Sequence, residues 1–497
     1  MVADGGPLNF RKADRRFLSA QSQGRPRMTH LADASSTLSI YSTLSRTKAP
    51  FVPLEGNKVS MYVCGVTVYD LCHIGHARVM VAFDVITRYL RARGYEVTYV
   101  RNITDIDDKI LKRADENGEA FEALTERMVQ AMHEDEGRLG ILRPDIEPRA
   151  TAHIADIIAM TETLIDKGFA YAASNGDVYY RVRRFEGYGK LNNRQLDDMQ
   201  SGARIEIEAA KEDPLDFVLW KAAKPGEASW PSPWGDGRPG WHIECSAMST
   251  CCLGNTFDIH GGGPDLTFPH HENEIAQSEA ATGQQYANVW MHAGAVRVGQ
   301  DKMSKSLGNF FTIRDVLEQH NPEVVRYLLV ASHYRSAISY EANSLDEARR
   351  SLERFYNALE NVTPEEGDVS DEWRARFIAA MDDDFNTAGA LSVLFELARE
   401  LNRAKKEAPQ QAPALAFELT SLGSLLGLFG QDPAAFLKGD TEGLALSEED
   451  IQQQIEARAA AKKSKDFAGA DRIRDELAAQ GIILKDSREG TTWVLEG

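Results

Sequence analysis

The first regular pattern along the chain is a short apolar run at residues 59–64, which predicts a buried strand followed by a turn at Gly65. Between residues 76 and 93 the apolar positions recur at helical spacing, and Gly94 stands where such a helix is expected to end. A second apolar run at 95–101 predicts another strand. Strand, helix and strand in this order predict a βαβ unit with parallel strands, because this crossover connection joins parallel strands.

The later part of the chain changes its pattern. Residues 149–239 are mixed and predict a separate lobe inserted into the sheet domain. The end of this lobe, from Trp220 to Trp241, is dense in Pro, Gly and Trp, which predicts an ordered, aromatic-packed loop. Helical spacing then dominates, and Pro413 suits the first turn of its helix. The expected helices span 119–142, 312–319, 343–360, 371–380, 387–407, 413–429, 447–465 and 467–480, and two short strands span 482–485 and 491–494.

These patterns predict an α/β fold class: a doubly wound parallel-sheet (Rossmann-like) domain with an insertion lobe, followed by a helical bundle and a small α+β C-terminal domain. Residues 1–36 are predicted to be a disordered N-terminal extension. An organelle transit peptide is the alternative interpretation of this segment, and Met28 is an alternative start of the protein. The expected boundaries are 1–36 for the extension, 37–148 and 240–310 for the two halves of the sheet domain, 149–239 for the insertion, 311–440 for the helical region and 441–497 for the C-terminal domain.

Composition narrows the possible classes of protein. The 497 residues exceed a single small module, and no run approaches the roughly 18 to 20 apolar residues of a membrane helix, so no membrane span is expected. A net charge of −19 argues against bulk attraction to nucleic acid, and any such contact needs local basic patches. Five irregularly spaced cysteines do not predict a disulfide framework. A cytoplasmic location is therefore expected.

Two short elements have the chemistry of phosphate binding. His73-Ile-Gly-His76 lies at the start of the first predicted helix, where backbone N–H groups attract anions and Gly75 leaves room for a ligand. Lys302-Met-Ser-Lys305 is a lysine-and-hydroxyl loop whose charges suit a polyphosphate. The alternatives are a pair of surface histidines and a solvated basic turn. The two elements in this order on an α/β scaffold are much less expected by chance than either alone.

The pair resembles the HIGH and KMSKS motifs of the class I aminoacyl-tRNA synthetases. Further stretches, at 61–76, 101–109, 216–221, 240–248, 257–274 and 381–387, are similar to the cysteine-specific family of that class, and the similarity spans about residues 39 to 497. This resemblance implies activation of L-cysteine with ATP and Mg²⁺, followed by transfer to cysteine tRNA. It assigns catalysis to His73, His76, Lys302 and Lys305, and ATP binding to Gly75, His73, His76 and Lys305.

A second constellation indicates a metal. Cys64, Cys245, His270 and Glu274 supply two thiolates, one imidazole and one carboxylate, which suit a tetrahedral zinc site with one ion per chain. The four-residue spacing of His270 and Glu274 predicts one helix face, with Pro269 in the first turn. Zinc would separate cysteine from serine better than size alone, which supplies roughly one to three kcal/mol. Buried apolar cysteines with a surface His–Glu pair, or a purely structural zinc, are the alternatives.

The remaining assignments come from the resemblance. Thr104, Trp241 and Asp265 are expected to bind the amino acid, whereas Cys251 and Cys252 are expected to be structural thiols. In the C-terminal domain, basic residues beside an aromatic suit RNA, although such a run also fits a solvated helix face. The expected tRNA-binding residues are Lys462, Lys463, Lys465, Phe467, Asp471 and Asp486, and Trp493 also matches this domain.

Three classes of function remain at this point. The resemblance favours a monomeric tRNA ligase, and an ATP-dependent cysteine ligase acting on a small amine would use the same adenylate without needing residues 441–497. A non-enzymatic zinc or RNA-binding protein would not need both phosphate elements. Cysteine-dependent exchange between ATP and pyrophosphate distinguishes the enzymes from the last class.

Overall fold

The computed structural model describes residues 31, 37–194, 196, 210–298, 301–302, 311–341, 343–439, 446–486 and 490–495. The chain forms two compact units, which are described separately. The first unit contains residues up to 319 together with 329–340 and 374–391, and the second contains 320–328, 341–373 and the chain from 392. In the described part of the chain, no helix combines the length and apolar character needed to cross a bilayer.

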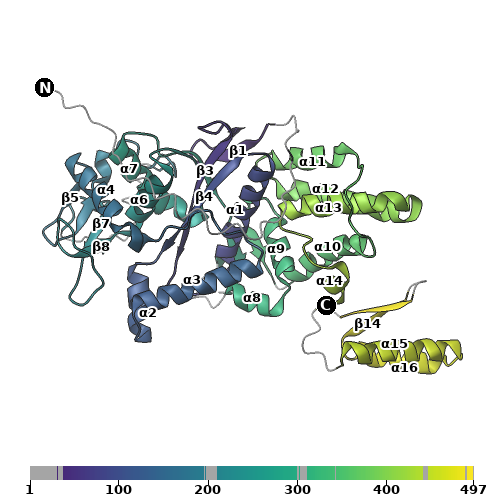
Figure 1. The fold of residues 1–497 in the computed structure, drawn as a ribbon. Coiled ribbons are helices and arrows are strands. Elements are labelled where there is room, and N and C mark those ends of the chain that lie inside the picture. The colour runs from purple at the N-terminus through teal and green to yellow at the C-terminus, as the bar shows by residue number, and fades with distance from the viewer. Residues whose placement is uncertain are drawn as a thin grey trace. The chain divides into compact units, whose positions relative to one another are not determined.

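A four-stranded parallel sheet forms the centre of the first unit, in the order β10-β9-β3-β4 (Figure 1). Helix α1 (Ile74–Ala92) and helix α6 (Trp241–Leu253) lie on opposite sides of it, which confirms the doubly wound arrangement. The strands are β3 (Lys58–Thr67), β4 (Glu96–Thr104), β9 (Phe257–Gly262) and β10 (Ala287–His292). Buried apolar side chains of α1, among them Phe83 and Ile86, explain why the predicted helix forms here.

The first strand is longer than its apolar run predicts. Gly65 lies inside β3 and does not begin a turn. A Cβ atom at this position would stand 1.8 Å from the backbone oxygen of Asn102 on β4. The pairing of β3 with β4 shifts register between Val63 and Val66. Glycine is therefore required here by the close approach of two backbones within the sheet.

The segment between the two halves of the sheet forms an antiparallel sheet of its own. Its strands follow chain order: β5 (Ala170–Ala172), β6 (Val178–Tyr180), β7 (Phe217–Ala222) and β8 (Gly237–Pro239). Helix α4 (Ile154–Asp166) shares its hydrophobic core. Trp220 is fully buried and Trp234 meets it edge to face at 6.1 Å, which confirms the predicted aromatic packing. The exact domain boundaries stay predictions.

Other elements of the first unit flank the sheet or follow it. They include β1 (Ser39–Ser42), β2 (Thr47–Pro50), α2 (Asp108–Asn117), α3 (Phe121–Arg138), α7 (Glu272–Thr282), β11 (Val296–Val298), β12 (Asp301–Lys302), α8 (Ile313–Gln319) and β13 (Ile338–Tyr340). Helices α9 (Pro322–Val330), α11 (Asp371–Met381) and α12 (Thr387–Glu407) have residues in both units. The predicted helices thus form close to their expected bounds.

The second unit is helical and ends in a small α+β module. Its helices are α10 (Ser344–Leu359), α13 (Ala412–Leu425), α14 (Pro433–Lys438), α15 (Glu448–Lys463) and α16 (Phe467–Ala478), and its hairpin consists of β14 (Ile482–Asp486) and β15 (Thr491–Leu495). Pro413 lies in the first turn of α13, as predicted. That helix ends before 429 because Gly427 has a left-handed φ of 70°. Residues 446–495, here called the C-terminal module, have their own core of Ile451, Ile455, Leu477, Ile482 and Trp493.

Candidate active site

A cavity of about 580 Å³, here called the main cavity, opens near the C-terminal ends of β3 and β4, where α/β sheets bind ligands. Gly65 and Thr67 line it from β3, and the beginning of α1 closes one side. The predicted residues that line it are Cys64, His73, Gly75, His76, Trp241 and Asp265. Thr104 is 2% exposed, accepts a hydrogen bond from Asn102 Nδ2 at 3.3 Å, and is not among the described residues that line the cavity.

His73 and His76 cap α1 reciprocally. The backbone N–H of His76 donates to Nδ1 of His73, and the backbone N–H of His73 donates to Nδ1 of His76, both at 3.2 Å. The two rings stack with centroids 3.6 Å apart. Because each Nδ1 accepts a hydrogen bond, the neutral rings carry their own proton on Nε2. The helix start therefore presents imidazole donors that suit an anion.

The segment that follows the lysine loop is hydrogen-bonded to the segment before α1. The backbone N–H of Ile313 donates to the oxygen of Cys72 at 2.9 Å, and Thr312 forms a β-bridge with His73. Lys302 lies on β12, where its backbone pairs with Arg297 of β11. The side chain of Lys302 and the whole of Lys305 lie outside the described residues, so their roles stay predictions.

Four buried side chains from four elements form what we call the donor cluster: Cys64 of β3, Cys245 of α6, His270 and Glu274. One possible ligand atom from each lies within 4.8 Å of the others. The Cys64 thiol donates to Glu274 Oε1 at 3.3 Å, and His270 Nε2 is 3.2 Å from the same oxygen. The fold thus brings together residues up to 210 positions apart in sequence.

The predicted single helix over His270 and Glu274 is wrong in detail. Pro269 and His270 belong to a π-helical turn, η5 (Thr267–His271), which contains the non-helical Phe268 and precedes α7. Pro269 therefore does not occupy the first turn of α7. The side chains of His270 and Glu274 still converge, because the wider turn continues directly into α7.

The two thiols of the donor cluster ionise differently. Burial raises the pKa of Cys64 well above the ordinary thiol value, and the nearby Cys245 and Glu274 raise it further. Burial also tends to raise the pKa of Cys245, but hydrogen bonds to Cys64 and His270 lower it to about 6. Of the two thiols, Cys245 is therefore the one whose surroundings favour the thiolate. A soft metal ion would favour both thiolates.

Residues that the sequence did not single out hold the donors in place. Oxygen Oε2 of Glu274 is 2.9 Å from His260 Nε2 and 3.0 Å from the Tyr286 hydroxyl. Nδ1 of His242 is 3.0 Å from Nδ1 of His270. His260 had a weak signal, since it directly precedes a glycine run, whereas Tyr286 had none. Such partners orient metal ligands and raise metal affinity.

A second set of donors shares two members with the first. Cys64, His260, His271 and Glu274 also lie within 4.8 Å of one another. However, His260 already pairs with Glu274, and His271 Nδ1 is 2.8 Å from His292 Nε2. The set with two thiols therefore fits a zinc ion better, and the extra histidines fit a supporting role.

Trp241 joins the donor cluster to the main cavity. Its ring is 38% exposed, lines the cavity and lies 4.3 Å from the ring of His270. Cys64 belongs to both the cavity wall and the donor cluster. A ligand in the cavity could thus reach the donor atoms beside an aromatic wall.

The predicted RNA-contacting residues lie in the C-terminal module. Phe467 is 64% exposed at the start of α16. Asp486 is held by Arg458 at 2.7 and 2.9 Å, by Lys462 at 2.9 Å and by the Thr491 hydroxyl at 2.7 Å. These partners, Arg458 first, hold the pKa of Asp486 far below its usual range.

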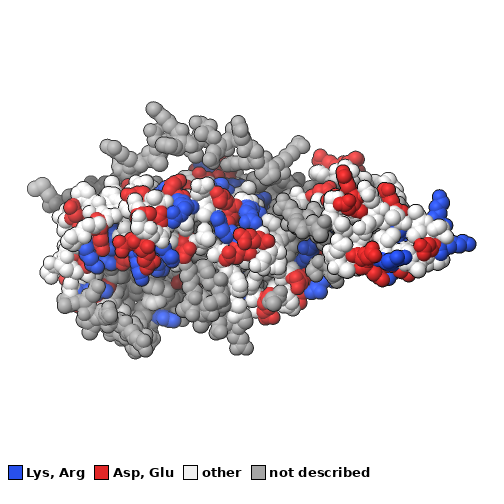
Figure 2. All heavy atoms as spheres, turned by 90° about the horizontal axis from the view of Figure 1, so that it is seen from below, with Lys and Arg blue, Asp and Glu red and all other residues white. Residues whose placement is uncertain are grey.

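The other predicted members of this surface are solvent-exposed. Lys463 is the last residue of α15 and Lys465 follows the helix, and both are exposed, while Asp471 of α16 lies 3.5 Å from Arg474. Figure 2 shows acidic and basic side chains intermixed over most of the face in view. The end of α15 thus places three lysines, at 462, 463 and 465, close together in the chain, and one of them, Lys462, is paired with Asp486.

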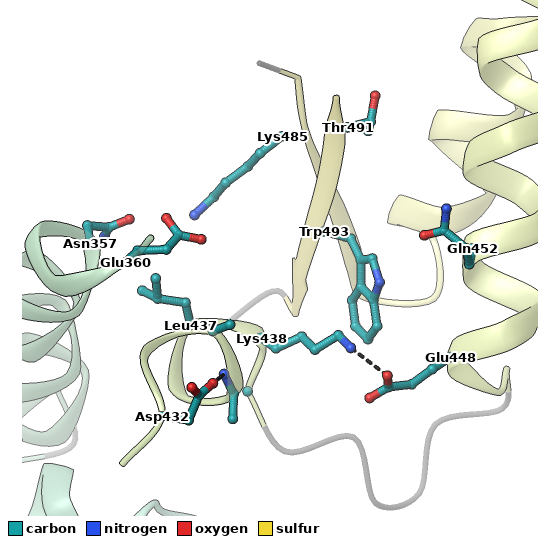
Figure 3. Close-up of a pocket in the computed structure, with 13 residues that line it drawn as sticks. Asn357, Glu360, Asp432, Leu437, Lys438, Glu448, Gln452, Lys485, Thr491 and Trp493 are labelled. Atoms are coloured by element: carbon teal, nitrogen blue, oxygen red, sulfur yellow. Dashed lines mark hydrogen bonds and ion pairs between the residues drawn. The ribbon is translucent and has the colours of Figure 1, made fainter. Parts of the chain in front are cut away.

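Trp493 has a different environment from Phe467. It is 8% exposed and packs in the core of the C-terminal module. Lys438 of α14 lies over its ring at 4.7 Å and also pairs with Glu448 at the start of α15 (Figure 3). These side chains line a pocket of about 530 Å³ within the second unit. Trp493 is therefore a packing residue, whereas the Phe467 side chain is exposed to solvent.

Comparison with known proteins agrees with this arrangement. Residues 50–350 match the family described as tRNA synthetases class I (C) catalytic domain, residues 376–430 match the DALR domain, and residues 447–493 match the cysteinyl-tRNA ligase anticodon binding domain. Together the three matches span both units and the C-terminal module.

Proteins that are similar to this chain over nearly its whole length are cysteine–tRNA ligases. A cysteine–tRNA ligase of Chromohalobacter salexigens is 76% identical over 460 residues, covering 93% of this chain and 100% of the relative. A cysteine–tRNA ligase of Azotobacter vinelandii is 67% identical, covering 92% and 99%. The solved methionyl-tRNA synthetase of Mycobacterium tuberculosis in complex with methionyl-adenylate has a TM-score of 0.53 at 15% identity, covering 77% of this chain and 91% of that one, which supports the fold alone.

Proposed function

Since this chain belongs to the cysteine–tRNA ligase family of class I aminoacyl-tRNA synthetases, we propose that its main cavity binds ATP beside L-cysteine and that its C-terminal module binds cysteine tRNA. The reaction joins cysteine to AMP with release of pyrophosphate, and then passes the cysteinyl group to the terminal ribose. One observation carries the proposal: Cys64 forms part of both the cavity wall and the donor cluster.

The phosphates of ATP are assigned to the start of α1. The Nε2–H groups of His73 and His76, together with the helix dipole, would stabilise charge that develops as pyrophosphate leaves. Lys302 and Lys305 are assigned the same task, and Mg²⁺ accompanies the nucleotide. Catalysis then consists of positioning and electrostatic stabilisation, without a covalent enzyme intermediate.

The donor cluster fits one zinc ion. Two thiols, an imidazole and a carboxylate are the ligand types that zinc prefers, and their convergence and burial support the assignment. When bound, zinc would offer a soft-ligand site that the thiolate of cysteine can enter and the hydroxyl of serine cannot. His260 and Tyr286 hold Glu274 in orientation, and His242 holds His270. A role in substrate choice is favoured over a purely structural one because Cys64 faces the cavity.

The amino-acid group is assigned to the cavity wall. Asp265 would hold the substrate ammonium and Trp241 would cover the side chain, since both line the main cavity. Thr104 does not line the cavity and would contribute indirectly, through its hydrogen bond with Asn102. Lys109, which lies over the Tyr69 ring at 5.5 Å, also lines the cavity and would add positive charge near the nucleotide, whereas the charge of Arg101 in the same wall is balanced by Glu136 and Glu147.

The C-terminal module distinguishes this function from a small-amine cysteine ligase, because residues 447–493 match an anticodon-binding domain that such a ligase does not need. We assign tRNA contacts to Lys462, Lys463, Lys465, Phe467, Asp471 and Asp486. The protein is proposed to act as a monomer in the cytoplasm.

Cysteine-dependent ATP–pyrophosphate exchange tests the first half-reaction. Exchange should require cysteine, should not be supported by serine, and should disappear on removal of zinc and return when zinc is restored. Charging of cysteine tRNA by the same preparation tests the second half. Exchange with equal activity for serine, or full activity after complete zinc removal, would contradict the assigned role of the donor cluster.

A further inference from the structure

A second group of reactive side chains lies away from the donor cluster, where α6 packs on α4 and on the 3₁₀ turn η2 (Ala150–His153). His153 ends that turn, Asp156 lies in the first turn of α4, and Cys251 lies near the end of α6. One nitrogen, one oxygen and one sulfur atom of these residues lie within 4.8 Å of one another. His153 Nδ1 is 2.8 Å from Asp156 Oδ2. Carboxylate, imidazole and thiol thus form the arrangement that activates a nucleophilic cysteine.

We propose that Cys251, assisted by His153 and Asp156, is a nucleophilic thiol that is modified by low-molecular-weight disulfides. The site is independent of the function proposed above, since none of its residues lines the main cavity or belongs to the donor cluster. It replaces the expectation that Cys251 is a purely structural thiol.

The charge state of His153 supports this proposal. The hydrogen bond with Asp156, followed by the interaction with Cys251, raises the pKa of His153 to about 9. These two groups, one from α4 and one from α6, are the causes that raise it. The ring is therefore an imidazolium at neutral pH, and it can donate its proton to the thiolate that leaves a disulfide attacked by Cys251.

Cys252 provides a comparison within the same helix turn. Both cysteines are half-buried, so exposure alone does not separate them. Cys252 packs against a hydrophobic core that includes Cys245 and Met248, and burial raises its pKa to about 12. The neighbouring thiol without an imidazole partner should therefore stay protonated and unreactive.

The proposed reaction is a thiol–disulfide exchange. The sulfur of Cys251 attacks one sulfur of the small disulfide, forming a new S–S bond while the original S–S bond breaks. The bonding electrons leave with the released thiolate, which takes the proton of the His153 imidazolium. The product is a mixed disulfide on Cys251 and one free small thiol, and no additional oxidant is needed.

A metal ion is the competing occupant of this group. The two atoms of His153 and Asp156 that face each other are 2.8 Å apart, whereas tetrahedral ligands about 2.0–2.1 Å from zinc lie roughly 3.3 Å from each other. The described residues supply only three donors here, and two of them are hydrogen-bonded together. The geometry therefore favours the activated thiol.

Glutathione disulfide added to the full-length protein tests the proposal, with the rate of modification at each cysteine followed by mass spectrometry of peptides. Cys251 should be modified before Cys252, and this preference should vanish in urea. His153→Gln should slow modification of Cys251 by roughly tenfold or more, since the leaving thiolate would lose its proton donor. Cys252→Ser is the matched control and should leave the rate at Cys251 unchanged.

Three results would overturn the proposal. The first is equal rates at Cys251 and Cys252 in the folded wild-type protein, a comparison that needs no variant. The second is an unchanged rate at Cys251 in a folded His153→Gln protein. The third is a second equivalent of bound zinc per chain that Cys251→Ser removes, which would identify the group as a metal site.

Discussion

The two carboxylate oxygens of Glu274 face different partners. One oxygen meets Cys64 and His270, and the other meets His260 and the Tyr286 hydroxyl. Tyr286→Phe should therefore weaken zinc binding by roughly 10- to 100-fold, the usual effect of removing an outer partner of a ligand. A competition titration against a chelator measures this.

Tyr180→Phe is the control for that experiment. It removes another buried tyrosine hydroxyl, which donates to the backbone oxygen of Ala276 and not to a carboxylate. Equal zinc affinities in the two variants and the wild type would show that Tyr286 does not orient Glu274.

Replacing the sulfur of Cys245 by oxygen should affect the binding of cysteine and leave the binding of ATP largely unchanged. Cys245→Ser should lower the zinc content and raise the KM for cysteine far more than the KM for ATP, because a hydroxyl is a poor zinc ligand. Metal analysis and exchange kinetics give both numbers. Cys252→Ser should change neither, and normal zinc content with normal cysteine affinity in Cys245→Ser would refute the ligand assignment.

Single residues of the site were predictable to different degrees. The four donors could be predicted because each has the chemistry of a zinc ligand and stands in a characteristic stretch. Tyr286 could not, because its contact with Glu274 exists only after the start of β10 has been placed beside α7. His271 shows a further limit, since spacing alone does not separate it from His270.

At the scale of elements, His73 at the start of α1 has two roles, helix capping and hydrogen-bond donation to the phosphates, and substitutions can separate them. His73 accepts the backbone N–H of His76 as the N-cap, so His73→Ala should cost about 1 kcal/mol of unfolding free energy. His73→Asn keeps a capping side chain and should retain stability. Both variants should lower the rate constant of adenylate formation by roughly 10², the scale of one lost donor.

Denaturant unfolding and rapid-mixing kinetics measure the two effects separately. A fully active His73→Asn enzyme would show that capping, and not donation from the imidazole, is the only contribution of His73.

Glu147 ties α3 and β4 together through charge. Burial tends to raise its pKa, but a hydrogen bond to His133 and the charges of Arg101 and Arg143 hold it at about 2. A carboxyl whose pKa is lowered by folding stabilises the protein above its unfolded pKa, and this contribution is lost as the pH falls through its folded pKa. Glu147→Gln should thus cost on the order of 3 kcal/mol near pH 7.

The pH dependence identifies that contribution. Urea midpoints of the wild type and Glu147→Gln should differ at pH 7 and converge as the pH falls from about 4 toward 2. A difference that stays constant over this range would assign the loss to packing and not to charge.

Elements were predictable where the apolar period is clear, as in α1 and in the helices of the second unit. The prediction failed at Gly65, because glycine was taken as a turn signal whereas the sheet needs its missing side chain. It also failed at Pro269, where a π-helical turn precedes α7. Both failures have a tertiary cause: the neighbouring strand or the site decides the local backbone.

At the scale of the whole molecule, the two half-reactions should be separable. The C-terminal module has its own apolar core, whereas the main cavity and the donor cluster lie in the first unit. A chain ending at Gly439 should therefore keep cysteine-dependent ATP–pyrophosphate exchange, and its charging of cysteine tRNA should fall steeply. Parallel exchange and charging assays measure both activities. Undiminished charging by the shortened chain would contradict the RNA-binding role and restore weight to a small-amine acceptor.

The glycines of the cavity wall have a consequence for inhibitors. A Cβ atom at Gly65 would stand 1.8 Å from the backbone oxygen of Asn102, and one at Gly294 would stand 2.0 Å from the backbone oxygen of Ser336. Neither position can accept another residue without displacing a second strand or loop. A compound that rests on these two glycines therefore contacts a surface that single substitutions cannot readily alter, and resistance to it should arise at other positions, or through increased expression of the enzyme.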